Sequence, residues 1–441
     1  MLPWSDRIFW FAMNIVKLAR LAWRNLLRNS RRTLITLLVS SAGFAALAIV
    51  AGYMEFTFYG LREMTICRGF TAGGGTGHLQ VFPAEALSKE ERFPLEFGID
   101  GYRELQHEIE KEKQVAATIP RIEFNGLISN GEKSISFLGT GVDPDKELAL
   151  IGYWNRTNRM SKKHKMDDSA YIRLKQGTPD GVLIGQEMAR ALNAEVGSSL
   201  TLMGTTVDGA VNAVDVTVAG IAKNPLKSID RYSLVAHLET AQNLMFTDKV
   251  SKIVVVLDDT RHTTQSIPSI LRRVDATAKT GTFAIVPWDK LAEYYHSVRD
   301  AYNIIFGFTG IIVVVIVFLS CANTMLMATM ERVREIGTLK AIGISNSWIT
   351  LMFLFEGFFI GLLSVVGGVM LKYLFSIIIN NIGFKMPPPP GMSSSYLLNI
   401  FPAIEFMPWI ALLVIGSTTF SGFLALVKLK NISIVNSLTH V

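Results

Sequence analysis

Long uncharged runs alternate with charged segments along this chain. Four runs carry either no charged residue or only one, and each is longer than the roughly 20 helical residues needed to cross about 30 Å of hydrocarbon. The runs are residues 33–54, 301–330, 341–371 and 406–427. Buried helices of a soluble protein are the alternative, but a soluble core seldom needs four runs of this length. We therefore expect four transmembrane helices.

The segment between the first two runs follows another pattern, in which short β-type runs alternate with helical ones. The expected strands are residues 77–82, 134–142, 199–204, 214–221 and 252–258, and the expected helices are 101–113 and 185–197. The glycine-rich segment 71–77 lacks the lysine and Ser/Thr of a phosphate-binding loop, and we expect a flexible joint there. The pattern predicts a large α+β domain.

Apolar positions at helical spacing continue upstream of the second run, from Leu291 to Ile305, without a proline. They predict one helix from about Asp289 to Lys340, roughly 75 Å long at 1.5 Å per residue. The hydrocarbon accounts for only about 30 Å of this length. We expect the helix to act as a lever that projects on both sides of a membrane.

Composition and charge agree with a membrane protein. The chain is 49% hydrophobic and 18% charged, with a mean hydropathy of +0.32. Its net charge of +6 arises from basic residues that gather beside the apolar runs rather than in a nucleic-acid-binding stripe. These are Lys17, Arg20, Arg24, Arg28, Arg31, Arg32, Arg332, Arg334, Lys340, Lys428 and Lys430. By the positive-inside rule, both termini face the cytoplasm and residues 55–300 lie outside.

The segment before the first run predicts an amphipathic helix. Its basic residues recur every three or four positions beside an apolar face formed by Ile15, Leu18, Ala22 and Leu26. Such a helix can lie at the headgroup level of a membrane, and a solvated charged face is the alternative. No small-residue cleavage site follows the first run, so we expect that run to stay as a helix.

The sequence carries no recognisable catalytic or metal-binding signature. It lacks G-x-x-x-x-G-K-[ST], H-E-x-x-H and G-x-S-x-G, and its seven histidines are scattered without metal-ligand spacing. Cys67 is expected outside as a free thiol and Cys321 lies within the second run, so no disulfide framework is expected. We expect a chain that is not an enzyme and that binds no cofactor or metal itself.

Glu356 is the one charge inside the third run. An ionisable group there indicates either a functional role with a buried partner or a position close enough to the interface to be hydrated, and both interpretations stay open. Gly357 and Gly361 follow it at a spacing of four, which favours close packing between helices.

A short mixed-charge segment, "MERVREIGTLKAIGISNSW" (residues 330–348), separates the second and third runs. Glu331 and Glu335 lie four residues apart on one helical face. Gly343 can end this helix before Ser345 or Ser347 starts the next one. Mixed charge suits a reversible protein interface better than lipid, and a solvated connector is the alternative.

At these residues the chain resembles a known family. "ERVREIGTLKAIGIS" followed by "EGFFIGLLSVVGG", together with "AWRNLLRNSRRTLITLL", is similar to the MacB/FtsX-type ABC transporter permeases. "GVLIGQEMARALNAEVGSSLTL" and "LVAHLETAQNLM" look like their periplasmic domain, and "KMPPPPGMS" is nearest to the lipoprotein-releasing (LolC/LolE-like) branch. The tail "KNISIVNSLTHV" follows the family pattern only loosely.

The resemblance implies an α-helical membrane protein with four transmembrane helices and a large periplasmic α+β domain between the first and second. It also implies a dimer with a second permease, identical or homologous, and a separate cytoplasmic ATPase that carries ATP and Mg. In this family the loop between the second and third spans docks on the ATPase. The coupling residues expected here are Glu331, Arg332, Arg334, Glu335, Gly337, Lys340 and Gly343.

The expected organisation follows from these patterns. It comprises a cytoplasmic entry helix (1–32), spans 33–54, 301–328, 347–379 and 406–427, a periplasmic domain and stalk (55–300), a coupling segment (329–346), a periplasmic loop (380–405) and a cytoplasmic tail (428–441). We expect a permease subunit in the bacterial inner membrane that extrudes a lipoprotein or another hydrophobic substrate. An FtsX-like signalling protein that controls a periplasmic cell-wall hydrolase is the alternative, and a periplasmic or outer-membrane partner is compatible with both.

Overall fold

Apolar helices and a mixed sheet form two separate parts of the chain. A computed structural model describes residues 4–28, 30–69, 74–88, 95, 97–157, 159, 167–224, 226–277, 282–388, 392 and 395–429. The helical unit comprises Met1–Thr57, Asp300–Phe384 and Leu398–Val441, and the sheet unit comprises Phe58–Arg299 and Lys385–Leu397. Helices α2 and α11 contain residues of both units, so at these two boundaries the chain passes from one unit to the other inside a continuous helix.

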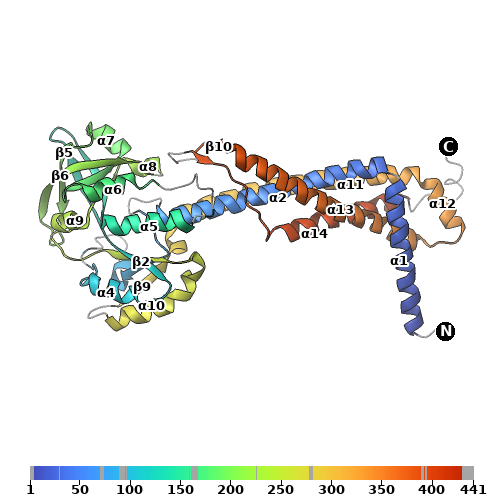
Figure 1. The fold of residues 1–441 in the computed structure, drawn as a ribbon, viewed down its shortest axis with the longest axis horizontal. Helices are drawn as coiled ribbons and strands as arrows, with labels where there is room; N and C mark the ends of the chain where they lie inside the picture. The colour runs from blue at the N-terminus through green and yellow to red at the C-terminus, as the bar shows by residue number, and fades with distance from the viewer. Residues whose placement is uncertain are drawn as a thin grey trace. The chain divides into compact units, whose positions relative to one another are not determined.

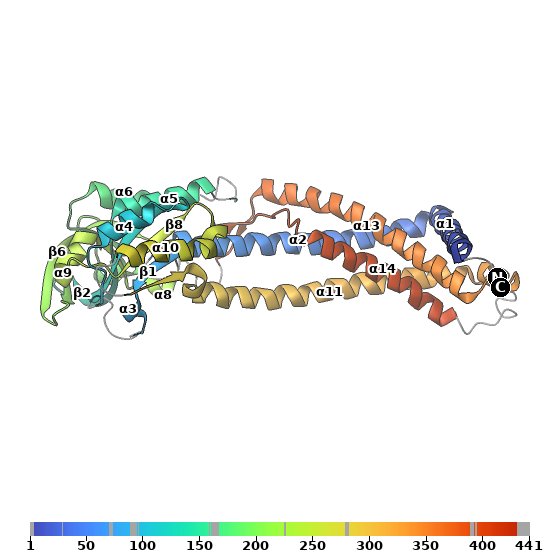
Figure 2. The ribbon, with the colours of Figure 1, turned by 90° about the horizontal axis from the view of Figure 1, so that it is seen from below.

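The helices of the first unit follow the apolar runs. They are α1 (Trp4–Arg28), α2 (Ser30–Cys67), α11 (Glu293–Glu331), α12 (Val333–Ala341), α13 (Asn346–Ile382) and α14 (Met407–Leu429). Within the described residues, three helical segments are long and apolar enough to cross a membrane, and a shorter apolar helix covers Met407–Phe423. The three are Thr33–Cys67, Glu293–Met327 and Asn346–Ile382. Helices α2, α11, α13 and α14 run along one another, whereas α1 crosses their direction (Figures 1 and 2).

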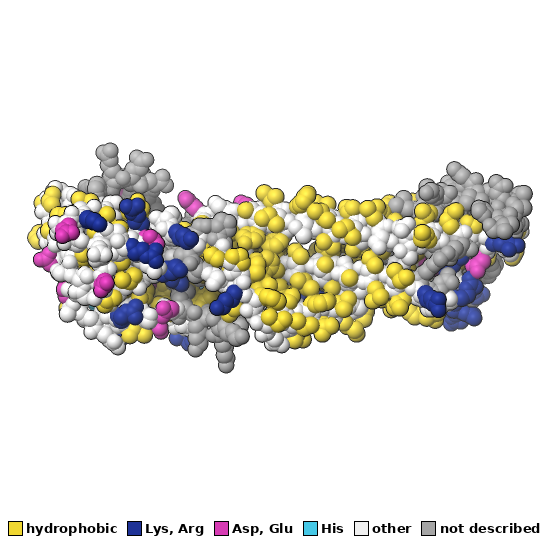
Figure 3. All heavy atoms as spheres, turned by 90° about the horizontal axis from the view of Figure 1, so that it is seen from above, with side chains coloured by type: hydrophobic (Ala, Val, Ile, Leu, Met, Phe, Trp, Pro, Cys, Tyr) yellow, Lys and Arg dark blue, Asp and Glu magenta, His cyan; other side chains and the backbone are white. Residues whose placement is uncertain are grey.

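The outer surface of these helices is apolar. Hydrophobic side chains are spread over the visible face of the helices, and Lys and Arg side chains gather at the end that carries α1 (Figure 3). Ile304, Phe308, Ile311 and Ile316 of α11 are among the most exposed large apolar residues. Such a surface is stable against lipid hydrocarbon but not against water.

The predicted continuous helix from Asp289 to Lys340 is wrong. A short 3₁₀ helix, η2 (Trp288–Leu291), precedes α11, and α11 ends at Glu331 before α12 begins at Val333. Helix α11 still spans 39 residues, and it passes through Gly307 and Gly310 without interruption. Arg332 lies at the break between α11 and α12, and its side chain is buried in the interior of the helical unit, as described below.

The sheet unit contains a nine-stranded sheet in the order β3-β7-β4-β6-β5-β2-β8-β1-β9, with β2 also paired to β3. The strands are β1 (Leu79–Pro83), β2 (Val115–Ser129), β3 (Ser134–Val142), β4 (Gly181–Gly185), β5 (Ser199–Thr205), β6 (Val211–Ala222), β7 (Ser233–His237), β8 (Lys252–Leu257) and β9 (Phe283–Pro287). Residues 127–129 of β2 pair with β3 on one side and with β5 on the other. Residues 115–121 of the same strand pair with β8. Strand β2 therefore closes a ring with β3, β7, β4, β6 and β5. It also pairs with β8, the first strand of the open part β8-β1-β9.

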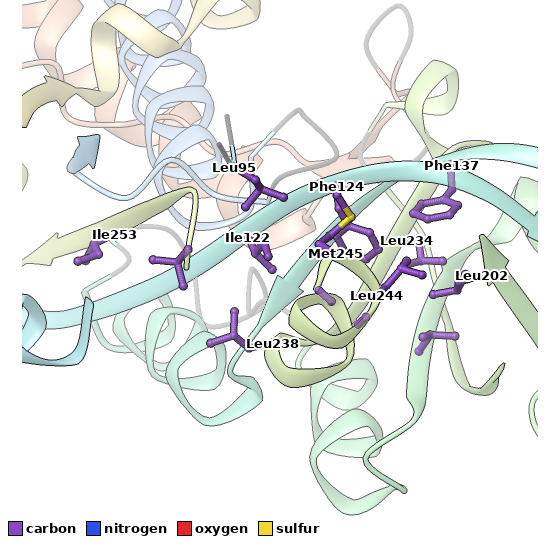
Figure 4. Close-up of a cluster of buried hydrophobic side chains, with 14 of the residues drawn as sticks. Leu95, Ile122, Phe124, Phe137, Leu202, Leu234, Leu238, Leu244, Met245 and Ile253 are labelled. Atoms are coloured by element: carbon purple, nitrogen blue, oxygen red, sulfur yellow. The ribbon is translucent and has the colours of Figure 1, made fainter. Parts of the chain in front are cut away.

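Short helices cover this sheet. They are α3 (Ala84–Ser88), α4 (Tyr102–Glu110), α5 (Pro144–Thr157), α6 (Ser169–Gln176), α7 (Gln186–Leu192), α8 (Lys227–Asp230), α9 (Leu238–Met245), η1 (Thr260–His262) and α10 (Thr263–Thr277), and a small pair, β10 (Lys385–Met386) and β11 (Tyr396–Leu397), completes the unit. The core lies between sheet and helices, where Ile122, Phe124, Phe137, Leu202 and Leu244 gather (Figure 4). The predicted α+β domain, with its five strands and two helices, is confirmed.

The glycine-rich segment before β1 is not a free joint in its described part. Residues 74–77 are mostly buried, and Thr76 and Gly77 donate backbone hydrogen bonds to α2. The Gly75 carbonyl accepts a hydrogen bond from the buried Arg121 guanidinium, which also forms an ion pair with Glu147 at 2.6 Å. Residues 71–73 of the predicted joint lie outside the described residues.

Candidate functional site

The C-terminal end of helix α12 is specified locally. At its C-terminal end, Gly343 has φ +91°, a left-handed conformation that glycine adopts at little cost. The Ile344 N–H donates to the Leu339 carbonyl across this turn, at 3.1 Å. Ser345, in extended conformation, then precedes α13. The predicted helix end at Gly343 and restart at Ser345 are confirmed.

One face of α12 is apolar and packs against neighbouring helices. Val333 and Ile336 are buried in a cluster with Ala22 of α1 and with Ile349 and Phe353 of α13. The apolar face predicted for the N-terminal helix is thus used, at Ala22, to contact protein. The described side chains of α1 begin at residue 16, so Ile15 of the predicted face is not among them.

A buried ion pair lies at the junction of α11 and α12. Arg332 donates from Nη1 to both carboxylate oxygens of Glu356, at 2.8 and 3.1 Å. Asn25 of α1 donates from Nδ2 to Glu356 Oε1 at 2.9 Å, and its backbone carbonyl accepts from Arg332 Nη2 at 3.4 Å. The side chains of Arg332 and Glu356 are only 8% and 4% exposed. Of the two interpretations of Glu356, the structure favours the buried partner over hydration at the interface.

Two residues expected on the coupling surface lie inside the protein. Arg332 is 7% exposed, because its guanidinium is occupied by Glu356, and Gly337 is buried as well. Their part in ATPase coupling stays a prediction, but neither residue is exposed at the surface of the helical unit. Arg332 instead holds the start of α12 against α1 and α13.

The other expected coupling residues whose side chains are described are exposed. Arg334 and Glu335 face outward, and Glu335 accepts from Arg28 of α1 at 2.5 Å, with both side chains more than half exposed. An exposed pair of this kind contributes about 0–1 kcal/mol, so it constrains α12 little. Beyond α12, Ile342 is 73% and Ile344 is 39% exposed. The side chains of Glu331 and Lys340 lie outside the described residues.

The exposed residues of α12 and the following turn therefore include both charged and apolar groups. The buried Arg332–Glu356 pair anchors this part of the chain to α13. This surface, defined by Arg334, Glu335, Ile342 and Ile344, is called the elbow below. Exposed apolar side chains rimmed by charge are typical of protein interfaces.

The glycines after Glu356 permit close packing of α13 against α14. A β-carbon at Gly357 would lie 2.5 Å from the Thr418 carbonyl oxygen, and one at Gly361 would lie 2.4 Å from Thr418 Oγ1. Real side chains do not tolerate such distances, so only glycine fits at this crossing. The predicted use of Gly357 and Gly361 in helix packing is confirmed.

The sequence reasoning missed two polar residues of the helical unit. Asn25 contacts Glu356 across 331 positions, and no local pattern indicates such a contact. Lys372 stands one residue beyond the apolar run that ends at Leu371, although it continues the four-residue series that begins at Glu356 and includes Ser364. Extending that series would have identified it. Among the residues described, no group of His, Cys, Asp or Glu has the arrangement of a metal site.

Comparison with known proteins identifies the family. The family model described as the MacB-like periplasmic core domain matches residues 33–271, and the one described as the FtsX-like permease C-terminal matches residues 307–434. The lipoprotein-releasing system transmembrane protein LolC of Neisseria meningitidis is 24% identical over 278 residues, which cover 61% of this chain and 63% of that protein. LolE of Haemophilus influenzae is 21% identical over 370 residues, 81% of this chain and 82% of that protein.

Other relatives match shorter stretches. The ABC transporter permease YtrF of Bacillus subtilis is 47% identical over 73 residues, 17% of each chain. The crystal structure of the periplasmic region of MacB from Actinobacillus actinomycetemcomitans covers 49% of this chain and 92% of its own, with 13% identity and a TM-score of 0.33. Because the two family models together cover most of the sequence, from the first apolar helix to the last, the chain belongs to the FtsX-like and MacB-like family of ABC transporter permeases.

Proposed function

We propose that this chain is the permease subunit of an ABC transporter and that the elbow is its docking site for a separate cytoplasmic ATPase. The observation that carries the proposal is the buried Arg332–Glu356 pair beneath an exposed surface of mixed charge. A force applied at the elbow is passed to α1, α11 and α13 because the pair and Asn25 connect all three. ATP and Mg belong to the ATPase, and this chain supplies no catalytic group.

The proposed membrane arrangement has four spans, with α14 as the fourth. Its 23 residues would extend roughly 35 Å, which is enough to cross the hydrocarbon. The basic residues of α1 and α12 support a cytoplasmic position for both termini and the elbow by the positive-inside rule. The sheet unit is then periplasmic, the membrane is the bacterial inner membrane, and a second permease, identical or homologous, completes the transporter.

The proposed substrate is a lipoprotein or another hydrophobic molecule. Relatives named for lipoprotein release support this class, although the chain spans about three fifths of the length of the LolC proteins that it matches. Because α2 and α11 each continue into the sheet unit, movement driven at the elbow can reach the periplasmic side through helices rather than flexible loops. A periplasmic or outer-membrane partner would receive the substrate.

Substitutions at the elbow test the docking assignment. Ile342→Asp and Glu335→Lys change exposed side chains and leave the buried pair intact. Burial of one isoleucine in an interface is worth about 1.5–3 kcal/mol, so Ile342→Asp should weaken ATPase binding roughly tenfold or more. The measurement is recovery of the ATPase, and of its hydrolysis, with permease purified from membranes at matched levels.

The control for this test is Val211→Asp in the sheet unit, where Val211 is 83% exposed. The control should retain the ATPase. Undiminished recovery with the elbow variants, or an equal loss with Val211→Asp, would remove the elbow from the coupling mechanism. Co-purification of a cell-wall hydrolase in place of a lipoprotein would favour the FtsX-like signalling alternative.

A further inference from the structure

Lys372 is a buried cation within an apolar helix. It lies in α13, ten residues before the helix ends at Ile382, or roughly 15 Å along the axis. Its exposure is 1%. A lysine inside a membrane-spanning helix costs about 2.5–3.5 kcal/mol at the bilayer centre, so it is retained only where it has specific partners.

The partners of Lys372 are protein groups. Its Nζ donates to the Pro402 carbonyl at 2.7 Å and to the Phe401 carbonyl at 3.3 Å. It also lies 4.4 Å from the ring centroid of Tyr373. A lysine that reached toward the headgroups would have an exposed ammonium, whereas this ammonium points into the segment between α13 and α14. Residues 398–406 of that segment are called the connector.

The connector is held by α2 on its other side. The Phe401 N–H donates to the Gly52 carbonyl at 3.2 Å, and the Ala403 N–H donates to Glu55 Oε2 at 2.9 Å. Gly52 is required for this approach, because a β-carbon there would lie 2.5 Å from the Phe401 carbonyl oxygen. The Lys372 ammonium of α13 therefore binds the carbonyls of the connector, and the Glu55 carboxylate of α2 binds one of its N–H groups.

The backbone of the connector is constrained where these groups meet. Ala403 has φ +51°, a left-handed conformation that is uncommon for residues other than glycine. Three residues earlier in the connector, the Ile400 N–H donates to Asn380 Oδ1 of α13 at 2.8 Å, and Asn380 Nδ2 donates to the Ile400 carbonyl at 3.2 Å. An unfavourable conformation of this kind persists when the surrounding contacts determine it.

We propose that Lys372 is a positioning residue that, together with Glu55, clasps the connector between α2 and α13. The clasp makes this end of α2, the connector and the adjoining part of α13 move as one body. The proposal concerns the helical unit alone and does not depend on the substrate or the ATPase.

Spin labelling of the full chain in lipid nanodiscs tests the clasp. Cys67 and Cys321 are both buried, and replacing them with serine leaves one introduced cysteine as the label site. The reporter is a nitroxide at Ile404 in the connector, which is 67% exposed, and the control reporter is at Leu412 in α14, which is 65% exposed. The variants are Lys372→Met, which keeps the chain length without donors, and Lys372→Arg, which keeps donors.

We expect Lys372→Met to remove the immobilised component of the spectrum at position 404 and to leave position 412 unchanged. Lys372→Arg should restore the immobilised component. An unchanged spectrum at position 404 in Lys372→Met would overturn the proposal, and so would equal mobilisation at both positions, because that result indicates general loosening.

A second variant and a distance measurement keep the test decisive if Lys372→Met does not fold. Glu55→Gln retains an acceptor oxygen but loses the charge, and it should mobilise position 404 less than Lys372→Met does. Labels at Ala46, which is exposed on α2, and at Ile404 should give a narrow distance distribution in the wild type. A distribution that is broad in the wild type, or that is not broadened by either variant, would contradict movement as one body.

Discussion

Removal of the Glu356 carboxylate tests the buried anchor of the elbow. Glu356→Ala deletes the acceptor of three hydrogen bonds, two from Arg332 and one from Asn25. The Arg332 guanidinium, with its side chain 8% exposed, loses the carboxylate and keeps the backbone carbonyl of Asn25 at 3.4 Å. Breaking a buried pair by removing one partner costs about 3–5 kcal/mol, because a buried charge loses its compensation.

Two further variants separate charge from shape. Glu356→Gln keeps a carbonyl oxygen that can accept from Arg332, so it should cost less than Glu356→Ala, about 1–3 kcal/mol. The double variant Arg332→Met with Glu356→Met removes both charges, and apolar replacement of a whole buried pair is often neutral or stabilising. We therefore expect the double variant to be more stable than Glu356→Ala.

The assay is reversible unfolding of the purified chain in detergent, read by intrinsic tryptophan fluorescence, together with ATPase recovery at matched membrane levels. Side-chain hydrogen bonds between membrane helices average only about 0.6 kcal/mol. A cost for Glu356→Ala at or below that value would refute the reasoning. A double variant whose destabilisation equals the sum for Arg332→Met and Glu356→Met measured singly would refute it as well, because additivity means that the two residues do not interact.

Two other predictions concern packing and pH. Gly361→Leu would place side-chain atoms against α14 and should lower the free energy of unfolding by about 1–3 kcal/mol or more. Gly416→Leu is the control, because a β-carbon there meets no atom within 4 Å, and it should not lower stability. Thermal unfolding in detergent measures both. Burial lowers the pKa of His78 in the sheet unit from 6.5 to about 4. Between pH 6.5 and pH 4 the unfolded chain therefore binds a proton at His78 that the folded chain excludes. The free energy of unfolding should decline by about 3 kcal/mol as the pH falls from 6.5 to 4. His78→Asn, which keeps an acceptor for the Leu257 N–H, should flatten this decline, and an equal slope in both proteins would contradict the assignment.

Features that depend on neighbouring positions were predictable from the sequence. The apolar runs became helices because length and hydropathy are local properties, and Gly343 ended α12 because its left-handed conformation is a local preference. Glu356 was recognised as exceptional for the same reason, since one charge in an apolar run needs a compensating group wherever that group comes from.

The partners of those residues were decided by the tertiary structure. Strand β2 was not predicted, because it has the fully buried cation Arg121 in its middle and Pro120 beside it, and neither residue is typical of a strand. Arg332 was assigned to the exposed surface, since nothing in its sequence neighbourhood reveals a carboxylate 24 positions away.

Asn25 and the carbonyls that bind Lys372 were missed in the same way. The Asn25 contact joins positions 331 apart, and the Lys372 contacts join positions 29 and 30 apart. The sequence by itself determined which segments are apolar, where the helix before α13 ends, and that Glu356 needs a partner. Only the tertiary structure decided which groups stabilise the buried charges. A charge in an apolar environment is stabilised by whichever polar group the packing of distant helices brings within hydrogen-bond distance.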